Sequence, residues 1–600
     1  MSALSRVLQI QRGEGRTVGL VVAFMFVSVA GLTIGESGIS ALFFDRVGPD
    51  SLPIMYLAQG AVGVAGMLLL SGALGRFERR RAYVALPVLM AVVIAIERAL
   101  AGGGGSWIYS AMWLTTTIAY LVQAVYLWGT AGLVTDARRA KRLFPLFGAG
   151  NILGAVAGGL ATRPLASAIG AANLLVVWAV ALVATSALCA VVLGVRGSGR
   201  PRRVRSRRPS AVAELRRGFG FVRRSPLLVW ISIASVLFSV LFYSLFLPFA
   251  QAATTRFPDP DELAGFLGIY WAAVTAVAFL VSILLANRLL GWFGAGAVVV
   301  VLSFLYVGAF GILLVTSTFA MLVAVRFGVN VWLQGVCSPA WETLINVTPE
   351  NRRDQTRAFL NGGPAQVGTA IAGLVQLVGQ DALTPRQLSV IGFVTALLAI
   401  VVGWQIRRSY TAALVAAIRA GRPRVFDDPV PNLAVAIRPD AQAVALAVAA
   451  MDEADPRMRR LASELLADAD DDRAIEALQR ALGDGDPLVR AHAVRALAAS
   501  GVLRDADLDR ALGDEDPGMR RAAVRLLAPG EAPATLLNDD SASVAAATAV
   551  NLNRGSSRDE AAWALGRLLA DEDPDVRLTA LDGLRDAAPD DVAAFASDRL

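Results

Sequence analysis

Ionisable side chains inside long apolar stretches are the residues of this sequence most suited to chemistry. Glu36 and Arg326 both lie in such stretches, and a charge in hydrocarbon is costly enough to make each a candidate functional group. Asn330 and Gln334 follow Arg326 at four-residue steps, which places all three on one helix face. A guanidinium beside two amides can bind an anionic solute such as a phosphorylated compound. The alternative is structural: Arg326 pairs with Glu36 or another acid and fixes the helix packing.

A stripe of aromatic and polar residues supplies further candidates. Tyr109, Trp113, Thr117, Tyr120 and Gln123 recur at steps of three or four residues, so a helix presents them on one side. Such a stripe can face a cavity and stack on a planar ring, although packing and interfacial anchoring are the commoner roles of aromatic stripes. We include Tyr120 and Gln123 in the predicted binding site.

The composition argues against catalysis and metal binding. A single histidine, His492, and two cysteines in 600 residues leave almost no material for imidazole catalysis, a Cys-rich metal site or a disulfide framework. No GxxxxGK[ST] phosphate loop occurs in the sequence. We therefore expect no enzyme activity, no cofactor and no metal site.

The segments that must position the candidates are strongly apolar. The chain is 55% hydrophobic and only 18% charged, which is typical of a polytopic membrane protein. A span across about 30 Å of hydrocarbon needs roughly 20 apolar residues. We predict twelve such spans, at residues 17–44, 52–75, 82–101, 106–134, 143–169, 171–195, 227–252, 263–290, 295–316, 318–345, 356–379 and 388–406.

The arginines predict the orientation of these spans. They cluster in every second connection, and the alternate connections are nearly bare, a pattern that places the basic side in the cytoplasm. We expect a multi-pass protein of the cell inner (plasma) membrane, with the lipid bilayer as a partner and both termini cytoplasmic. Because the arginines flank apolar spans, the basic charge does not imply nucleic-acid binding.

The two groups of six spans share a loop pattern. An acid, two arginines, a further basic residue, Phe and Gly follow span four and recur after span ten. A parallel six-plus-six repeat is the plan of the major facilitator fold. We take the charged residues of both loops, with Glu342, as cytoplasmic gate or loop candidates: Asp136, Arg138, Arg139, Lys141, Arg142, Glu342, Glu350, Arg352, Arg353 and Arg357.

The last part of the chain is different in charge and pattern. Residues up to 430 carry 37 Lys+Arg and 17 Asp+Glu, whereas those from 431 carry 19 and 32. Short amphipathic helices there begin at recurring Asp-Pro pairs, in which Asp can cap the helix and Pro can occupy its first turn. The repeats resemble HEAT repeats, which predicts an α-solenoid that binds an unidentified protein partner. The pairs are Asp455-Pro456, Asp486-Pro487, Asp516-Pro517 and Asp573-Pro574.

These observations predict an all-α protein: a twelve-helix, six-plus-six membrane bundle with a cytoplasmic solenoid of HEAT-like repeats. The central linker holds eleven arginines against one acid, and it either contacts anionic lipid headgroups or only fixes the topology. The predicted parts are the N-terminal half 1–195, the basic linker 196–226, the C-terminal half 227–410, a juxtamembrane linker 411–430 and the repeat domain 431–600.

One short motif adds a family resemblance. The segment AKRLFPLFG at residues 140–148, continuing AGNILG to residue 154, resembles the sequence after the fourth span of ATP/ADP translocases of the bacterial and plastid nucleotide-transporter family. The resemblance implies ATP:ADP exchange on the twelve-span plan, and relatives with HEAT-like tails. That family usually carries lysine within the bundle, whereas the only lysine here is Lys141, so an arginine would have to hold the phosphate.

The leading hypothesis is a secondary-active transporter that works by alternating access on a small anionic solute, with ATP or ADP as the solute that the resemblance implies. The predicted site holds Glu36, which binds a coupling proton or balances Arg326. A second hypothesis is a non-transporting membrane receptor or scaffold that presents the repeat domain. A third is a lipid-moving protein of the facilitator fold.

Overall fold

The computed structural model describes residues 14–103, 105–135, 137–195, 219–346, 348, 356–357, 359–360, 362–419, 441–467, 469, 471–553 and 558–584. Within these residues every regular element is a helix. The chain divides into two compact units, Met1–Ala413 with Val425–Ile437 and Leu414–Arg424 with Arg438–Leu600. The protein is therefore all-α, as the sequence predicts.

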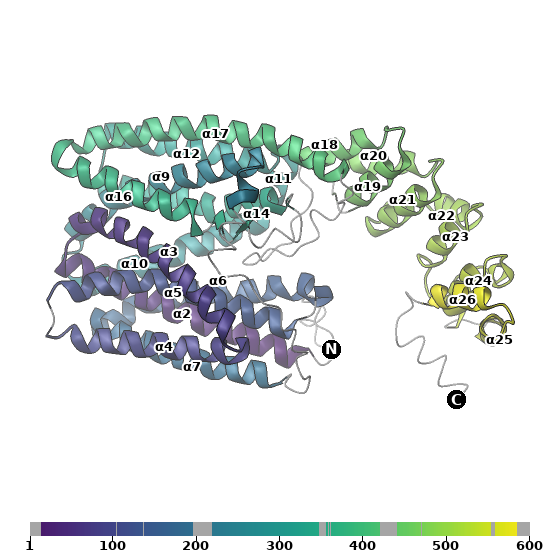
Figure 1. Ribbon diagram of the computed structural model, residues 1–600, viewed down its shortest axis with the longest axis horizontal. Coiled ribbons are helices and arrows are strands. Elements are labelled where there is room, and N and C mark those ends of the chain that lie inside the picture. Colours follow the sequence, from purple (N-terminus) through teal and green to yellow (C-terminus); the bar gives the residue numbers. More distant parts are fainter. Residues whose placement is uncertain are drawn as a thin grey trace. The chain divides into compact units, whose positions relative to one another are not determined.

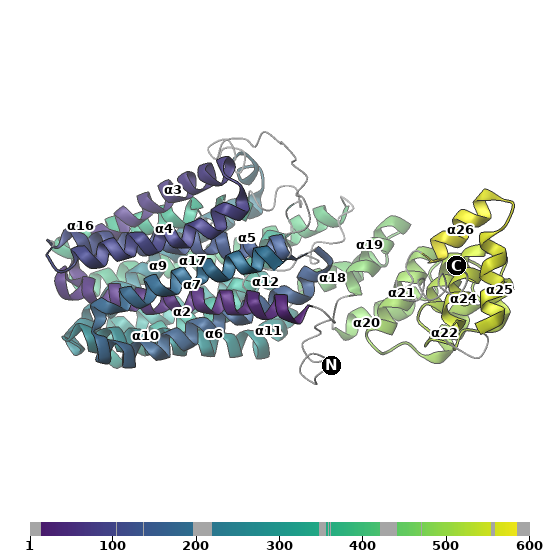
Figure 2. The same cartoon turned by 90° about the horizontal axis from the view of Figure 1, so that it is seen from below.

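The first unit is a bundle of long helices that run side by side (Figures 1 and 2). Eleven helical segments among the described residues are long and apolar enough to cross a membrane. The helices that form them are α2 (Gly15–Arg46), α3 (Leu52–Arg76), α4 (Arg79–Leu100), α5 (Trp107–Val134), α6 (Ala137–Ile169), α7 (Leu174–Val195), α9 (Pro226–Arg256), α10 (Pro260–Val281), α12 (Ala295–Val315), α13 (Phe319–Trp332) and α17 (Pro385–Arg419).

The remaining predicted span, residues 356–379, corresponds to helix α16 (Pro364–Ala382). The helix begins later than predicted because Pro364 occupies its first turn, where a missing backbone N–H costs nothing. It is not among the eleven strongly apolar segments, because Gln366, Gln376 and Gln380 lower its hydropathy. α16 packs along α3 and α9, so these amides lie on a helix with partners on two sides.

Two predicted spans contain π-helical turns that the sequence did not indicate. α10 continues through a π turn at Ser282–Ala286 into α11 (Asn287–Phe293). α13 continues through a π turn at Leu333–Cys337 into α14 (Ser338–Asn346). The two turns contact each other, and π turns within long helices are frequent at functional sites.

Small residues bring helix backbones of the bundle close together. A Cβ atom on Gly154 of α6 would lie 2.5 Å from the Phe26 carbonyl oxygen of α2, and one on Gly158 would lie 2.6 Å from the Ala30 carbonyl oxygen. This is the close backbone approach that the glycine spacing predicts. Between the two six-helix groups, Gly159 of α6 faces the Gly268 carbonyl oxygen of α10 in the same way, at 2.5 Å.

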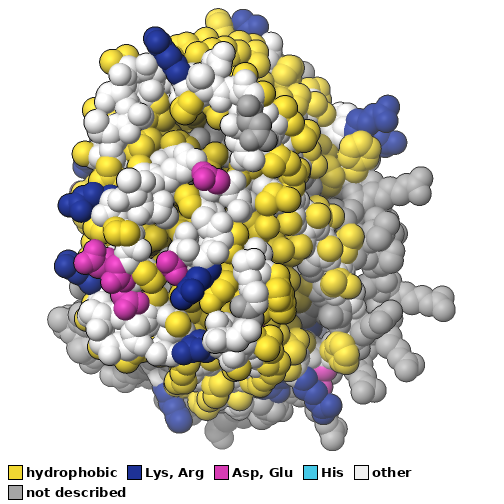
Figure 3. All heavy atoms as spheres, turned by 90° about the vertical axis from the view of Figure 1, so that its left-hand side faces the viewer, with side chains coloured by type: hydrophobic (Ala, Val, Ile, Leu, Met, Phe, Trp, Pro, Cys, Tyr) yellow, Lys and Arg dark blue, Asp and Glu magenta, His cyan; other side chains and the backbone are white. Residues whose placement is uncertain are grey.

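One end of the bundle carries charges of both signs. Figure 3 looks onto the end at which α4 ends and α17 begins, and shows acidic and basic side chains scattered among apolar and uncharged ones. At the other end, α4 begins with Arg79, Arg80 and Arg81. We call this second end, where α7 also ends, the arginine-rich end.

The second unit is a succession of short helices in which aspartates cap the first turns. The carboxylate of Asp455 accepts from the Arg457 backbone N–H at 2.9 Å, and Asp486, Asp516 and Asp573 cap their helices similarly. The Asp-Pro signature therefore marks helix starts, as predicted. The helices are α18 (Ala441–Ala450), α19 (Pro456–Leu466), α20 (Asp472–Ala481), α21 (Pro487–Ala499), α22 (Asp505–Leu512), α23 (Pro517–Val524), α24 (Ala542–Leu552), α25 (Arg558–Leu569) and α26 (Pro574–Leu584).

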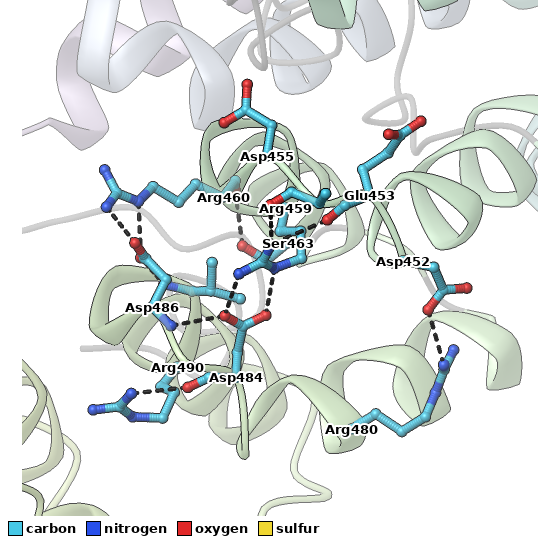
Figure 4. Close-up of polar contacts among 12 residues, drawn as sticks. Asp452, Glu453, Asp455, Arg459, Arg460, Ser463, Arg480, Asp484, Asp486 and Arg490 are labelled. Carbon is cyan, nitrogen blue, oxygen red and sulfur yellow. Dashed lines mark hydrogen bonds and ion pairs between the residues drawn. The ribbon is translucent and has the colours of Figure 1, made fainter.

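Ion pairs join each repeat to the next. An arginine four residues after the capping aspartate binds an aspartate of the following repeat in a bidentate manner (Figure 4), and also donates to a backbone carbonyl before its own helix. We call these pairs the repeat ladder. They are Arg459–Asp484 at 2.7 Å, Arg490–Asp514 at 2.6 Å and Arg520–Asp539 at 2.6 Å.

Candidate functional site

A cavity of about 490 Å³ lies in the bundle, with walls from both six-helix groups. Helices α2 and α5 supply one side, and α9, α10 and α13 supply the other. Tyr120 is 48% exposed, so its side chain borders space large enough to hold water or a solute. Its polar lining consists mainly of Glu36, Gln59, Tyr120, Gln123, Tyr243, Arg326 and Gln334, with hydroxyls of Ser and Thr residues between them.

Five of the six predicted binding residues line this cavity: Glu36, Tyr120, Gln123, Arg326 and Gln334. They come from α2, α5, α13 and the π turn that follows α13. Separate stretches of sequence, selected because each held a polar residue in an apolar span, thus meet at one place.

The sixth predicted residue, Asn330, does not line the cavity. Its amide nitrogen donates to the Tyr270 hydroxyl at 3.3 Å and to the Arg326 backbone carbonyl at 2.9 Å. Asn330 therefore meets Tyr270 of α10 instead of the cavity. Its position indicates that it supports the helix that carries Arg326.

Arg326 is held by aromatic rings. Its guanidinium carbon lies 4.0 Å from the ring centroid of Phe246 and 4.5 Å from that of Phe249, and Phe242 and Trp271 are within 5.7 Å. We call these four rings the aromatic cage. Rings attract a cation through their negative faces but accept few of its hydrogen bonds, so the cage stabilises the charge and leaves N–H groups to bind something else.

Arg326 forms no ion pair with a carboxylate within the described part of the chain. The side chain is 2% exposed, and its Nη1 atom has no hydrogen-bond partner there. A buried donor without a partner is costly, more so when it is charged. A buried guanidinium whose Nη1 donor is left free by the described residues at a cavity wall is therefore suited to bind an anion.

Glu36 is bound elsewhere. Its carboxylate accepts a hydrogen bond from the Tyr120 hydroxyl, and the described residues show no ion pair between it and Arg326. The structural alternative, in which the two charges only satisfy each other, does not describe this conformation. The cavity instead presents a carboxylate from the first six helices and a guanidinium from the second six.

Hydrogen bonds fix several other lining residues. The Gln123 amide nitrogen donates to the Ser28 hydroxyl at 2.9 Å and to the Ser28 carbonyl at 3.0 Å, so it ties α5 to α2. Gln59 donates to the Tyr243 hydroxyl at 3.2 Å. These contacts hold the lining in place and leave Gln123 with less capacity for a solute than predicted.

Sequence reasoning missed the aromatic rings that surround Arg326. Phe242, Phe246 and Phe249 are spaced by three or four residues, which was the available signal. In a helix that is apolar throughout, however, aromatic residues at this spacing cannot be told apart from ordinary packing residues. Trp271 and Tyr243 were missed for the same reason.

A second cavity, of about 420 Å³, adjoins the first and shares Phe242 and Tyr243 with it. Its lining includes Trp341 and Glu342 of α14. Glu342 forms an ion pair with Arg357, with Arg357 Nε 2.8 Å from the carboxylate. Two predicted gate residues are thus in contact beside the second cavity.

The other gate candidates lie outside what the structure describes. Among the side chains that it does describe, no group of three or more His, Cys, Asp or Glu residues could hold a metal ion. The undescribed candidates are Asp136, Glu350, Arg352 and Arg353, together with the side chains of Arg138, Arg139, Lys141 and Arg142.

Comparison with known proteins supports both parts of the architecture. A family model described as HEAT repeats matches residues 444–528, which confirms the HEAT-like prediction. None of the curated proteins matches the chain.

Solved structures resemble the bundle. A bacterial homologue of the iron transporter ferroportin in an inward-facing state is 14% identical, with 65% of this chain and 98% of that chain covered and a TM-score of 0.50. The nucleoside transporter NupG is 12% identical, with 66% of this chain and 99% of that chain covered and a TM-score of 0.47. An auto-inhibited POT family peptide transporter is 12% identical, with 66% of this chain and 96% of that chain covered and a TM-score of 0.49. At 14% identity the likeness to the first of these structures concerns the fold alone, a bundle of the major facilitator type. The eleven apolar spans among the described residues indicate a multi-pass membrane protein.

Proposed function

We propose that this protein is a secondary membrane transporter for a solute that carries one anionic group on a planar or apolar body. The observation that carries the proposal is the buried guanidinium of Arg326, whose Nη1 has no partner among the described residues, at the wall of a cavity between two six-helix groups. A scaffold has no need to retain such a costly group, whereas a carrier of anions does.

The charge of the cavity favours a solute with a single negative charge. Among the described lining residues, Arg326 is the only cation and Glu36 the only anion. A nucleoside triphosphate carries several negative charges, and one guanidinium opposed by a carboxylate would compensate them poorly. The rings of Trp271, Tyr243 and Phe246 provide flat apolar surface for the rest of the solute.

Nucleotide exchange is the second candidate. It is favoured by the resemblance of residues 140–154 to ATP/ADP translocases, and it would require more cations than the described cavity lining supplies. The basic residues of the predicted gate are the available source. Uptake measurements with both solute classes separate the two candidates.

Glu36 offers a way to couple transport to a proton. An ionised Glu36 would repel an anion in the same low-dielectric cavity, whereas a protonated Glu36 would not. Proton binding at Glu36 and anion binding at Arg326 would therefore favour each other. Replacement of Glu36 by Gln should abolish the dependence of uptake on a pH gradient while counter-exchange of solute persists.

Alternating access would move the two six-helix groups against each other. Their contact through Gly159 and Gly268 is flanked by the small side chains of Thr162 and Ala272, which suits a rocking movement. The cavity that adjoins the binding cavity would form the path to the arginine-rich end, with the Glu342–Arg357 ion pair as its gate. We place that end, both termini and the repeat domain in the cytoplasm of a cell with the bundle in its inner membrane, on the distribution of arginines.

The test is uptake into proteoliposomes of labelled aromatic monocarboxylates and monophosphates, and in parallel of ATP and ADP. We expect saturable uptake of a monoanion that Arg326→Ala abolishes and that the matched variant of an exposed arginine, Arg386→Ala, retains. Removal of residues 431–600 should preserve this uptake. If the folded wild-type protein moves none of these anions, or if Arg326→Ala moves them equally well, the proposal is wrong and the scaffold or lipid-moving hypothesis replaces it.

A further inference from the structure

An apolar groove of about 870 Å³ lies between α4 and α7. It shares no lining residue with the solute cavity. The two helices pack along each other and follow the lower edge of the bundle in Figure 1. Val88, Leu89 and Val92 form much of the α4 wall, and Gly194 lies on the α7 wall. Arg80 and Arg81 line the groove where α4 begins.

The shape of the groove suits a hydrocarbon chain. Leu89 is 60% exposed and Val92 is 50% exposed, so large apolar side chains face outward, as expected of a surface in contact with lipid. Val84, Val88 and Val92 are spaced by four residues and extend over about 12 Å of helix at 1.5 Å per residue. On the opposite wall, a Cβ atom on Gly194 would meet nothing within 4 Å, so the missing side chain is what keeps the groove open.

The charge at one end of the groove indicates an anionic headgroup. Arg80 has no partner among the described residues, and Arg81 makes only an exposed contact with Glu78, at 3.3 Å. Exposed pairs of this kind are weak, so both guanidinium groups are available. Guanidinium groups bind phosphate through parallel N–H donors.

We propose that this groove binds one anionic phospholipid, with an acyl chain between α4 and α7 and the headgroup phosphate at Arg80 and Arg81. Two positive charges without a nearby compensating acid besides Glu78 favour a lipid of net negative charge over a zwitterionic one. The site involves only the first six helices. It does not depend on which solute the protein moves, or on whether it moves one.

The experiment is native mass spectrometry of the full-length protein, titrated in detergent with phosphatidylglycerol or phosphatidylcholine of the same acyl chains. The variants are Arg80→Gln with Arg81→Gln, which removes the charge, and Gly194→Phe, which fills the groove. Arg386→Gln, an exposed arginine outside the groove, is the matched control. Gel filtration and thermal unfolding without added lipid verify that each variant folds.

We expect one phosphatidylglycerol to bind the wild-type protein and the control at least ten times more tightly than phosphatidylcholine. The double arginine variant should lose that preference, and Gly194→Phe should lose the bound lipid of either kind. Equal binding of the two lipids by the wild-type protein would overturn the headgroup assignment. Undiminished binding by a folded Gly194→Phe variant would overturn the groove as the site.

Discussion

Arginines of the two units have opposite surroundings. In the repeat domain, Arg490 meets both oxygens of Asp514 and a backbone carbonyl. In the bundle, Arg326 meets four aromatic rings and keeps a donor without a partner among the described residues. A guanidinium whose hydrogen bonds are complete acts as a structural clamp, whereas one that is surrounded by ring faces and keeps Nη1 without a partner remains able to bind.

The two units also differ in what holds their helices together. α2 and α6 approach through glycines, with carbonyl oxygens where side chains would be. The repeats are joined by charged pairs and capped by aspartates. In lipid the hydrophobic effect does not hold helices together, so close packing of their backbones must stabilise the bundle. A unit in water can be stabilised by ion pairs and by burial of apolar surface together.

Replacement of Arg326 by Met should have the largest effect. We expect at least a hundredfold loss of kcat/KM for uptake, about 2.7 kcal/mol, while the thermal stability of the protein in detergent stays equal or rises. Loss of a buried, unpaired charge removes a desolvation cost. If Arg326→Met lowers stability markedly, the arginine is a clamp after all, and the contrast with Arg490 fails.

Replacement of Gly154 by Val should separate α2 from α6. The added Cβ would lie 2.5 Å from the Phe26 carbonyl oxygen, and overpacking of this kind costs about 1–3 kcal/mol. Gly132→Ala on α5 is the matched control, because a Cβ there meets nothing within 4 Å. Thermal unfolding in detergent should show a clear decrease for the first variant and little change for the second.

Replacement of Arg490 by Ala should weaken the repeat ladder by about 2 kcal/mol, the scale of a hydrogen-bonded charged pair. Asp514 would then be left partly buried without its partner. Hydrogen exchange of the amides of α21 and α23 in the full-length protein measures the change locally. Arg495→Ala, which removes an exposed arginine from the same helix, should leave exchange nearly unchanged; equal effects of the two variants would show that the ladder adds nothing.

Acid should loosen the repeats more than the bundle. The Arg460 guanidinium bonded to Asp486 holds the pKa of that carboxyl below its usual range. A lowered pKa in the folded state means stability that is present above the ordinary pKa of Asp, about 3.9, and lost as pH falls through the folded value. We expect hydrogen exchange in α19 and α21 to accelerate below about pH 4.

Arg460→Met supplies the check on this assignment. Without the guanidinium, the pKa of Asp486 should move up toward its ordinary value, so Asp486 should contribute less to the loss of stability in acid and the acceleration below about pH 4 should be smaller than in the wild-type protein. An unchanged acceleration would show that Asp486 is not responsible.

The features that the sequence predicted share a physical basis. Long apolar segments and Asp-Pro caps depend on neighbouring residues alone, so both can be recognised from consecutive residues of the sequence. Glu36 and Arg326 were identified because a charge in an apolar span is rare for energetic reasons that hold in any fold. The helices and caps were predictable because their causes are local. Glu36 and Arg326 could be selected because the cost of a charge in an apolar span does not depend on the fold.

The features that were missed depend on which helices meet. The aromatic cage consists of ordinary apolar residues until α9 and α10 bring them to Arg326. The hydrogen bond of Asn330 needs Tyr270 of α10, and the π turns arise from backbone bonding that leaves no mark on composition. The late start of α16 was readable at Pro364 and at the glycine pair before it, Gly362-Gly363.

The π turn at Leu333–Cys337 makes chain length itself a constraint. It lies between Arg326, at the cavity, and Glu342, in the ion pair with Arg357. One residue fewer in that turn would rotate α14 by about 100° relative to α13 and draw it along the axis by about 1.5 Å. The distance in residues between the cavity and the ion pair therefore sets their alignment, and a single deletion there would do more harm than most substitutions.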